Sequence, residues 1–266
     1  MNLLGAFVLR DFRLERSYRL AFFSQIFGIA TTLLSAGFLS RIVPGGQAAL
    51  RPYGGDYFTF VLIGTAALNF FTVAMGSFSS SLGQEQAHGT LESLLVSPND
   101  PRALLLYGAA WPFVFSTIQL VAYVTLGGLL FGAELHPGHL LLAGSAAVMT
   151  LVAVSAIGLV VAGVIVLTKR AGGLIALIGA AFALLGGVLY PIAVLPRPLQ
   201  LVAELLPVSH GLDAIRLALV AHPDLGAIAR HLAILTGFAA VLVPAGLQGF
   251  QWAVRRARRA GTLMQH

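Results

Sequence analysis

The sequence predicts an all-α membrane protein, because it combines an apolar composition, few charges and several long apolar runs. Of the 266 residues, 58% are hydrophobic and only 10% are charged. Soluble domains carry about 25% charged residues, so this chain has too little polar surface for a soluble globule. Its repeated runs of about 20 or more apolar residues match helices that cross a hydrocarbon core of about 30 Å. The short alternating segments typical of a membrane barrel are absent from the sequence.

Six such runs are expected to span the membrane within a single domain, 1–266. The predicted spans are residues 20–39, 57–78, 104–131, 140–167, 172–194 and 231–252. Residues 1–19 are basic and imperfectly amphipathic, which favours an N-terminal interfacial helix. Residues 195–230 are interrupted by prolines yet keep apolar residues at helical spacing. We therefore expect two short re-entrant helices between the fifth and sixth spans.

The distribution of basic residues orients these spans. Six spans put both termini on one side of the membrane. The termini and the connections after the second and fourth spans carry 11 of the 16 Lys and Arg residues. The positive-inside rule therefore predicts cytoplasmic termini and a cytoplasmic connection after the second span, in a multi-pass protein of the plasma (cell inner) membrane. Topology accounts for the net charge of +6, so nucleic-acid binding is not expected.

The connection after the second span, residues 84–98, has the pattern of a short helix with one apolar face. Gly89 suits a left-handed helix end, Thr90 suits an N-cap, and Glu92 would lie in the first turn, where the helix dipole favours an anion. Pro98 limits the helix to about two turns. Three leucines at i, i+3 and i+4 share one face: Leu91, Leu94 and Leu95. A helix of this kind is suited to docking in a groove of a soluble partner.

This segment resembles the coupling helix of ABC-2-type permeases, the membrane subunits of one class of ATP-binding-cassette exporters. The motif that carries the resemblance is Glu85-x-x-x-Gly89-Thr90-Leu91-Glu92-x-Leu94-Leu95-x-Ser97-Pro98. The resemblance implies that an ATPase is contacted by Glu85, Gly89, Thr90, Leu91, Glu92, Leu94 and Leu95. An ordinary surface helix in a connecting loop is the alternative interpretation.

The exit from the fifth predicted span resembles the re-entrant region of the same family. The matching residues are Tyr190-Pro191-Ile192-x-x-Leu195-Pro196 and Leu206-Pro207-x-x-His210-x-x-Asp213-x-x-Arg216. The family often has Asn before the second proline and Tyr after it, where this chain has Leu206 and His210. The candidate residues of this region are Pro207, His210, Asp213 and Arg216. A local polar network that stabilises the segment is favoured over a proton or substrate site.

Polar residues within the spans are candidates for a transport pathway. Asn69 is the strongest of them, because a buried amide needs hydrogen-bond partners. The pathway candidates are Ser24, Thr31, Thr65, Asn69, Phe70, Thr72 and Tyr190. Small and hydroxyl residues also mediate contacts between helices in lipid, and this alternative stays open for the whole set.

The chain lacks the chemistry needed to hydrolyse ATP or to catalyse a reaction by itself. It has no Gly-x-x-x-x-Gly-Lys-Ser/Thr loop to hold phosphates and no cysteine. Glu134, His136 and His139 are interpreted as a surface turn rather than a metal site. We therefore expect no cofactor and no metal on this chain, and we do not expect it to be an enzyme.

The resemblance implies an exporter whose ATP and Mg²⁺ are used by a separate ATPase subunit. It also implies that two copies of this chain form a homodimer. The apolar stripes of the predicted spans favour an amphiphilic substrate such as a drug, a lipid or a polyketide-like molecule. Membrane lipids are also expected partners. The alternatives are a polysaccharide or lipid-linked glycan exporter of the same family, or an ATP-independent secondary transporter or channel. A proton-coupled mechanism is disfavoured because no predicted span carries a charged pair near its middle.

Overall fold

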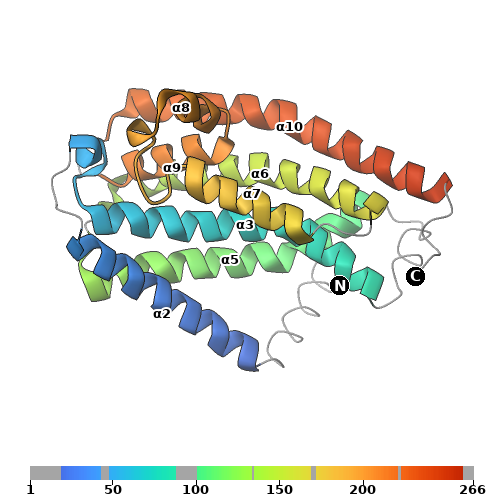
Figure 1. The fold of residues 1–266 in the computed structure, drawn as a ribbon, viewed down its shortest axis with the longest axis horizontal. Coiled ribbons are helices and arrows are strands. Elements are labelled where there is room, and N and C mark those ends of the chain that lie inside the picture. The colour runs from blue at the N-terminus through green and yellow to red at the C-terminus, as the bar shows by residue number, and fades with distance from the viewer. Residues whose placement is uncertain are drawn as a thin grey trace.

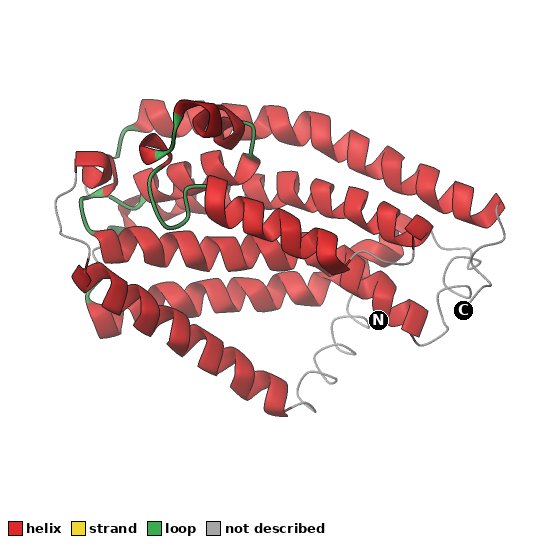
Figure 2. Cartoon of the chain, in the orientation of Figure 1, coloured by secondary structure: helices red, strands yellow, loops and turns green. Residues whose placement is uncertain are grey.

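The computed structural model describes residues 19–42, 48–87, 101–133, 135–168, 172–220 and 223–259, and these ranges contain helices and connecting turns without a strand (Figure 2). The α-helices are α2 (Arg19–Ile42), α3 (Tyr57–Ala87), α5 (Pro101–Phe131), α6 (Leu140–Thr168), α7 (Gly172–Leu185), α8 (Arg197–Glu204), α9 (Pro207–Ala218) and α10 (Leu225–Arg259). Three short 3₁₀ helices are η1 (Ala48–Tyr53), η2 (Pro137–His139) and η3 (Ile192–Val194).

The long helices form an elongated bundle in which successive helices run in opposite directions (Figure 1). The last turn of α3, the first turn of α5 and the last turn of α10 lie toward one end of this bundle. The opposite end carries η1 and the segment 186–220, which contains η3, α8 and α9. The two ends of the bundle therefore differ in construction.

Helix α3 lies at the centre of the bundle. In its most apolar stretch 72% of the residues are buried, against 11% in α10. Phe71 and Met75 of α3 are fully buried and belong to one core cluster with Val154 of α6, Phe182 of α7 and Leu212 of α9. The peripheral helices instead expose large apolar side chains, including Leu129 of α5 and Val241 of α10. This pattern suits a bundle whose outer surface faces lipid.

Four helices among the described residues are long and apolar enough to cross a membrane: Tyr57–Ser80, Gly108–Phe131, Leu140–Thr168 and Leu225–Arg256. They correspond to the second, third, fourth and sixth predicted spans. The prediction of an all-helical, membrane-spanning protein is confirmed. Helix α2 covers the first predicted span with 24 residues but is not among these four. The six-span topology therefore stays a prediction.

The fifth predicted span, 172–194, is corrected by the structure, because α7 ends at Leu185. Gly187 follows with a φ of +74°, a left-handed conformation that suits glycine and turns the chain away from the helix axis. The chain then passes Pro191 into η3 rather than continuing as a helix. Apolar composition alone did not reveal this early end of the helix.

The segment between α7 and α10 contains two short helices, α8 and α9, as expected. Whether they re-enter the membrane is untested. The predicted interfacial helix lies outside the described residues apart from Arg19, which begins α2. The predicted coupling helix also lies outside them, since the described part of α3 ends at Ala87 and α5 begins at Pro101.

Candidate functional site

Helix α9 is buried along most of its length although it is only 12 residues long. Pro207 occupies the first turn, where its missing N–H would have no helical partner and its fixed φ favours helix initiation. Val208, Leu212 and Ala214 are completely buried in the main core cluster. Packing against α6 and α10 therefore fixes the position of the polar side chains that α9 carries.

Arg216 is the most completely buried charged side chain of the described residues, with 2% of its surface exposed. Its guanidinium donates hydrogen bonds to three backbone carbonyls: Gly187 O at 2.7 Å, Phe60 O at 2.9 Å and Val188 O at 2.9 Å. The Arg216 Cζ also lies 3.4 Å from the centroid of the Phe60 ring, a cation–π contact. One side chain thus joins α9 to the first turns of α3 and to the turn that follows α7.

The close approach of Arg216 to α3 requires a residue without a side chain at position 64. A Cβ on Gly64 would lie 2.3 Å from the carbonyl oxygen of Val188 and 2.4 Å from a guanidinium nitrogen of Arg216. Neither contact is sterically possible, and the nearer atom belongs to the backbone. Gly64 is therefore part of the same site as Arg216.

A second polar contact supports this site from η1. The hydroxyl of Tyr53 donates a hydrogen bond of 2.9 Å to Oδ1 of Asp213, one turn before Arg216 on α9. The ring of Tyr53 meets the Phe60 ring edge-on at 5.3 Å between centroids. Asp213 thereby holds η1 on α9 without forming an ion pair with Arg216 in the part of the chain that the structure describes.

Burial shifts the pKa values of Arg216 and Tyr53. Burial lowers the pKa of Arg216 to about 10, while the Asp213 carboxylate opposes this effect. The guanidinium therefore stays protonated near neutral pH and keeps its hydrogen bonds. Burial raises the pKa of Tyr53, and the neighbouring Asp213 carboxylate raises it further, so the phenol keeps the proton it donates.

His210 links α9 to α10 through a pair of imidazoles. Its Nε2 lies 2.9 Å from the carbonyl oxygen of Glu204, and its Nδ1 lies 3.1 Å from Nδ1 of His231. Because a carbonyl only accepts, Nε2 of His210 carries a hydrogen. In neutral His210 the Nδ1 atom is then the acceptor, and His231 donates to it. The four re-entrant candidates Pro207, His210, Asp213 and Arg216 thus all belong to one packed region.

The pathway candidates on α3 follow a partly open strip of this helix. Asn69 is exposed, and its amide forms no hydrogen bond within the described part of the chain. Thr65 and Thr72 are half-buried, and each hydroxyl donates to a carbonyl of its own helix, Val61 O and Leu68 O, both at 2.8 Å. Asn69 is therefore the member of this set whose polar group has no internal partner.

The other pathway candidates do not gather with Asn69 in one site. Phe70 is 6% exposed and its ring lies 5.7 Å from that of Phe71, within the core. Thr31 is exposed on α2 and donates to Phe27 O at 2.8 Å. The Tyr190 hydroxyl donates to the carbonyl of Leu184 and so closes the turn after α7. The side chain of Ser24 lies outside the described residues, and a pathway role for any of the four stays a prediction.

The coupling candidates lie at the boundary of the described residues. Glu85 belongs to the last turns of α3, at the bundle end opposite α9. The remaining candidates lie outside the described residues: Gly89, Thr90, Leu91, Glu92, Leu94 and Leu95. Their role stays a prediction.

Sequence reasoning missed the partners of Arg216. Gly64 and Phe60 were interpreted only as parts of an apolar span, and Gly187 was placed inside a continuous fifth helix. The pair Gly186 and Gly187, a few residues before Pro191, was a signal in the sequence that the helix ends early. The acceptors are backbone carbonyls, which every residue has, so the side chains of the sequence do not identify them.

Comparison with known families gives an independent result. The model of the family described as ABC-2 type transporter matches residues 3–220, which is most of the chain and includes every described element from α2 to α9. The chain belongs to the ABC-2 type transporter family. A search of curated proteins found no match.

Family membership gives the chain its general role. It is an ABC-2 type permease, a multi-pass membrane component of a transporter, and permeases of this family generally work with a separate ATPase subunit. The resemblance drawn from the sequence motifs is thereby confirmed. The 186–220 segment, which Arg216 ties to α3, falls within the matched region.

Replacing Arg216 tests the importance of its three carbonyl contacts. Arg216→Met should destabilise the permease by about 2–4 kcal/mol, because buried carbonyls lose their donors. Arg216→Lys keeps the charge but cannot reproduce the planar fork of donors, so it should be destabilising as well. The measurement is thermal unfolding of the purified protein in detergent. Arg230→Met is the matched control, since Arg230 is exposed, and an equal unfolding temperature for the two Met variants would contradict the role of Arg216.

Proposed function

We propose that this permease is one half of the membrane part of an ABC exporter, in which two copies of the chain work with two separate ATPase subunits. The substrate is an amphiphilic molecule moved out of the cytoplasm, of the drug, lipid or polyketide-like kind. The pathway lies between the two copies and includes the strip of α3 that carries Asn69. The ATPase subunits bind ATP and Mg²⁺, and this chain supplies the segment that couples them to the membrane.

The observation that carries the two-copy arrangement is the exposure of Asn69. This residue lies near the middle of the apolar stretch Tyr57–Ser80, and its amide has no partner within the described part of the chain. In a lone copy the amide would face hydrocarbon, where an unsatisfied polar group costs about 2 kcal/mol or more. A second copy, or a polar pathway between copies, would remove that cost.

The geometry of the bundle supports the coupling role of the connection after α3. Helices α3 and α5 flank this connection, and both meet it at the bundle end opposite α9. The last turns of α10 lie toward the same end and carry Arg255, Arg256 and Arg259. A basic end of this kind favours the cytoplasmic side. A partner ATPase would then reach residues 88–100 directly.

The opposite end supports a re-entrant position for the 186–220 segment. Helix α8 exposes Leu199, Leu201 and Val202, with exposed fractions of 41%, 54% and 44%. Exposed apolar side chains on so short a helix suit contact with lipid rather than with water. The segment would therefore lie in the outer part of the membrane.

The topology can be tested with single cysteines, because the chain has none of its own. Arg51→Cys and Arg197→Cys place the thiol on exposed residues at the α9 end, and a membrane-impermeant maleimide should label both on intact cells. Gln86→Cys and Arg259→Cys should be labelled only after the cells are permeabilised. Labelling of Gln86→Cys from outside would overturn the proposed orientation.

The coupling segment is tested by charging its predicted apolar face. The double variant Leu91→Asp, Leu94→Asp should insert normally, because both positions lie outside the predicted spans. It should lose assembly with the ATPase subunit, because burying two carboxylates against an apolar groove costs several kcal/mol. The measurement is co-purification of the two subunits, followed by ATPase activity.

Glu92→Ala serves as the mild control for the same segment. It should reduce assembly only slightly, since a charge near a helix N-terminus contributes about 0.3–1 kcal/mol. Normal assembly and transport by the double Asp variant would reduce the segment to an ordinary surface helix. Saturable ATP hydrolysis by this chain alone would contradict the need for a separate ATPase.

The pathway role of α3 is tested at Asn69. Asn69→Leu removes the amide while keeping a similar volume, so assembly and basal ATP hydrolysis should be preserved. Stimulation of ATP hydrolysis by candidate amphiphiles should change, because the pathway would lose a polar contact. Thr236→Val on α10 is a matched control, since this exposed hydroxyl already donates to Leu232 O of its own helix and is not a pathway candidate. Unchanged stimulation in Asn69→Leu would remove this strip from the pathway.

A further inference from the structure

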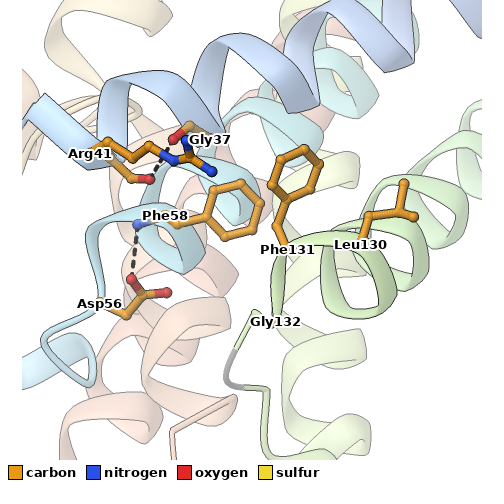
Figure 3. A pocket seen from close by; sticks show the side chains of 8 residues that line it. Gly37, Arg41, Asp56, Phe58, Leu130, Phe131 and Gly132 are labelled. Atoms are coloured by element: carbon orange, nitrogen blue, oxygen red, sulfur yellow. Dashed lines mark hydrogen bonds between the residues drawn. The ribbon is translucent and has the colours of Figure 1, made fainter.

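A cavity of about 450 Å³ lies where α2, α3 and α5 meet, at the bundle end that carries η1 (Figure 3). The last turns of α2 and α5 and the approach to α3 line it, and the lining residues are Gly37, Ser40, Arg41, Asp56, Phe58, Leu130, Phe131 and Gly132. Its volume is within the range of small-molecule sites, which is about 300–1,000 Å³. All of the lining elements belong to the ends of long apolar helices, so the cavity lies near the level of the lipid head groups.

The cavity is lined by the guanidinium of Arg41, for which the described ranges contain no hydrogen bond or ion pair. Arg41 is exposed, and Figure 3 shows its side chain extending toward the Phe58 ring. Its guanidinium lies over the ring of Phe38, with Cζ 5.9 Å from the ring centroid. Its planar fork of donors is therefore available for an anion such as a phosphate.

An anionic group lies on another wall of the same cavity. The carboxylate of Asp56 caps α3 by accepting hydrogen bonds from the backbone N–H of Phe58 at 3.2 Å and of Thr59 at 2.8 Å, and it also accepts one from the Thr59 hydroxyl. These bonds fix its orientation. Since a carboxylate has about four acceptor positions, these hydrogen bonds leave capacity for one further donor. Asp56 and Arg41 form no ion pair with each other in the described structure, so neither charge neutralises the other.

The mouth of the cavity is apolar. Leu130 is 67% exposed and Phe38, one turn before Arg41, is 61% exposed. The centroids of the Phe58 and Phe131 rings lie 5.2 Å apart, and the two rings form an aromatic wall. A ligand with a charged head and hydrocarbon chains could therefore place its head in the cavity and its chains along α2 and α5.

We propose that this cavity binds the head group of a zwitterionic phospholipid that carries a primary ammonium. The phosphate is held by Arg41, the ammonium donates to Asp56, and the acyl chains lie against Leu130 and Phe38. A purely anionic head group would satisfy Arg41 but would meet repulsion from Asp56. A choline head group would lack the N–H donors that the carboxylate accepts. The site is separate from the strip of α3 that carries Asn69, and it does not depend on the proposed export function.

The experiment is native mass spectrometry of the purified full-length chain in detergent, titrated with phosphatidylethanolamine, phosphatidylglycerol and phosphatidylcholine of identical acyl chains. The unaltered protein should bind phosphatidylethanolamine most tightly. Arg41→Gln should weaken both phosphatidylethanolamine and phosphatidylglycerol by about tenfold, the effect of one lost charge-assisted contact. Asp56→Asn should weaken only phosphatidylethanolamine, because Asn still caps the helix but lacks the charge. Retained phosphatidylglycerol binding shows that this variant is folded.

Two matched controls lie at the same end of the bundle outside the cavity. Arg51→Gln removes an exposed arginine of η1, and Asp224→Asn alters the residue that caps α10 through the N–H of Ala227. Both should leave the lipid preference unchanged. The proposal is overturned if Arg41→Gln behaves as Arg51→Gln does, or if Asp56→Asn keeps the preference for phosphatidylethanolamine. Soluble O-phosphoethanolamine should compete weakly, and competition as strong as that of the lipid would show a site for a free phosphate compound instead.

Discussion

The structure depends on one buried charge that is satisfied by backbone carbonyls rather than by a carboxylate. Removing a guanidinium from water is costly unless its donors are all used. Arg216 meets this requirement in part: its two terminal nitrogens donate to the carbonyls of Gly187, Val188 and Phe60, and the guanidinium lies over the Phe60 ring. Its buried Nε has no hydrogen-bond partner within the described residues. Arginine suits the task because its donors form a rigid fork, whereas a lysine ammonium is a strongly hydrated point charge. The contact fixes three separate parts of the chain with respect to one another.

The α9 end of the bundle is therefore held together by several hydrogen bonds between distant parts of the chain. At the α9 end, Arg216, the Tyr53 to Asp213 hydrogen bond and the His210 to His231 pair tie α9 to α3, η1 and α10. These contacts connect residues that are far apart in the sequence, so local movement of α9 would break several bonds together. In the exporter proposed above, in which the ATPase acts at the other end, a transport cycle would move this segment together with the helices that it joins.

The sequence predicted the fold class and most helices because those follow from composition and periodicity, which act locally. The spans at 104–131 and 140–167 nearly coincide with α5 and α6. It did not predict the end of α7, since a glycine turn inside an apolar run has the same hydropathy as a helix. Arg216 was recognised as part of a polar network, but its partners were not, because a carbonyl acceptor is present at every residue. The cavity beside Arg41 forms where three helices meet, so no single segment of the sequence predicts it.

The early end of α7 and the burial of Arg216 explain each other. A helix of 14 residues is about 21 Å long, less than the hydrocarbon core of about 30 Å. If α7 begins at one membrane surface, the chain after it is non-helical at membrane depth. Such backbone is tolerated only where protein surrounds it and satisfies its polar groups. Gly187 and Val188 are buried, and Arg216 donates to both of their carbonyls. The arginine thus supplies, from α9, the hydrogen bonds that continuation of α7 would otherwise have provided.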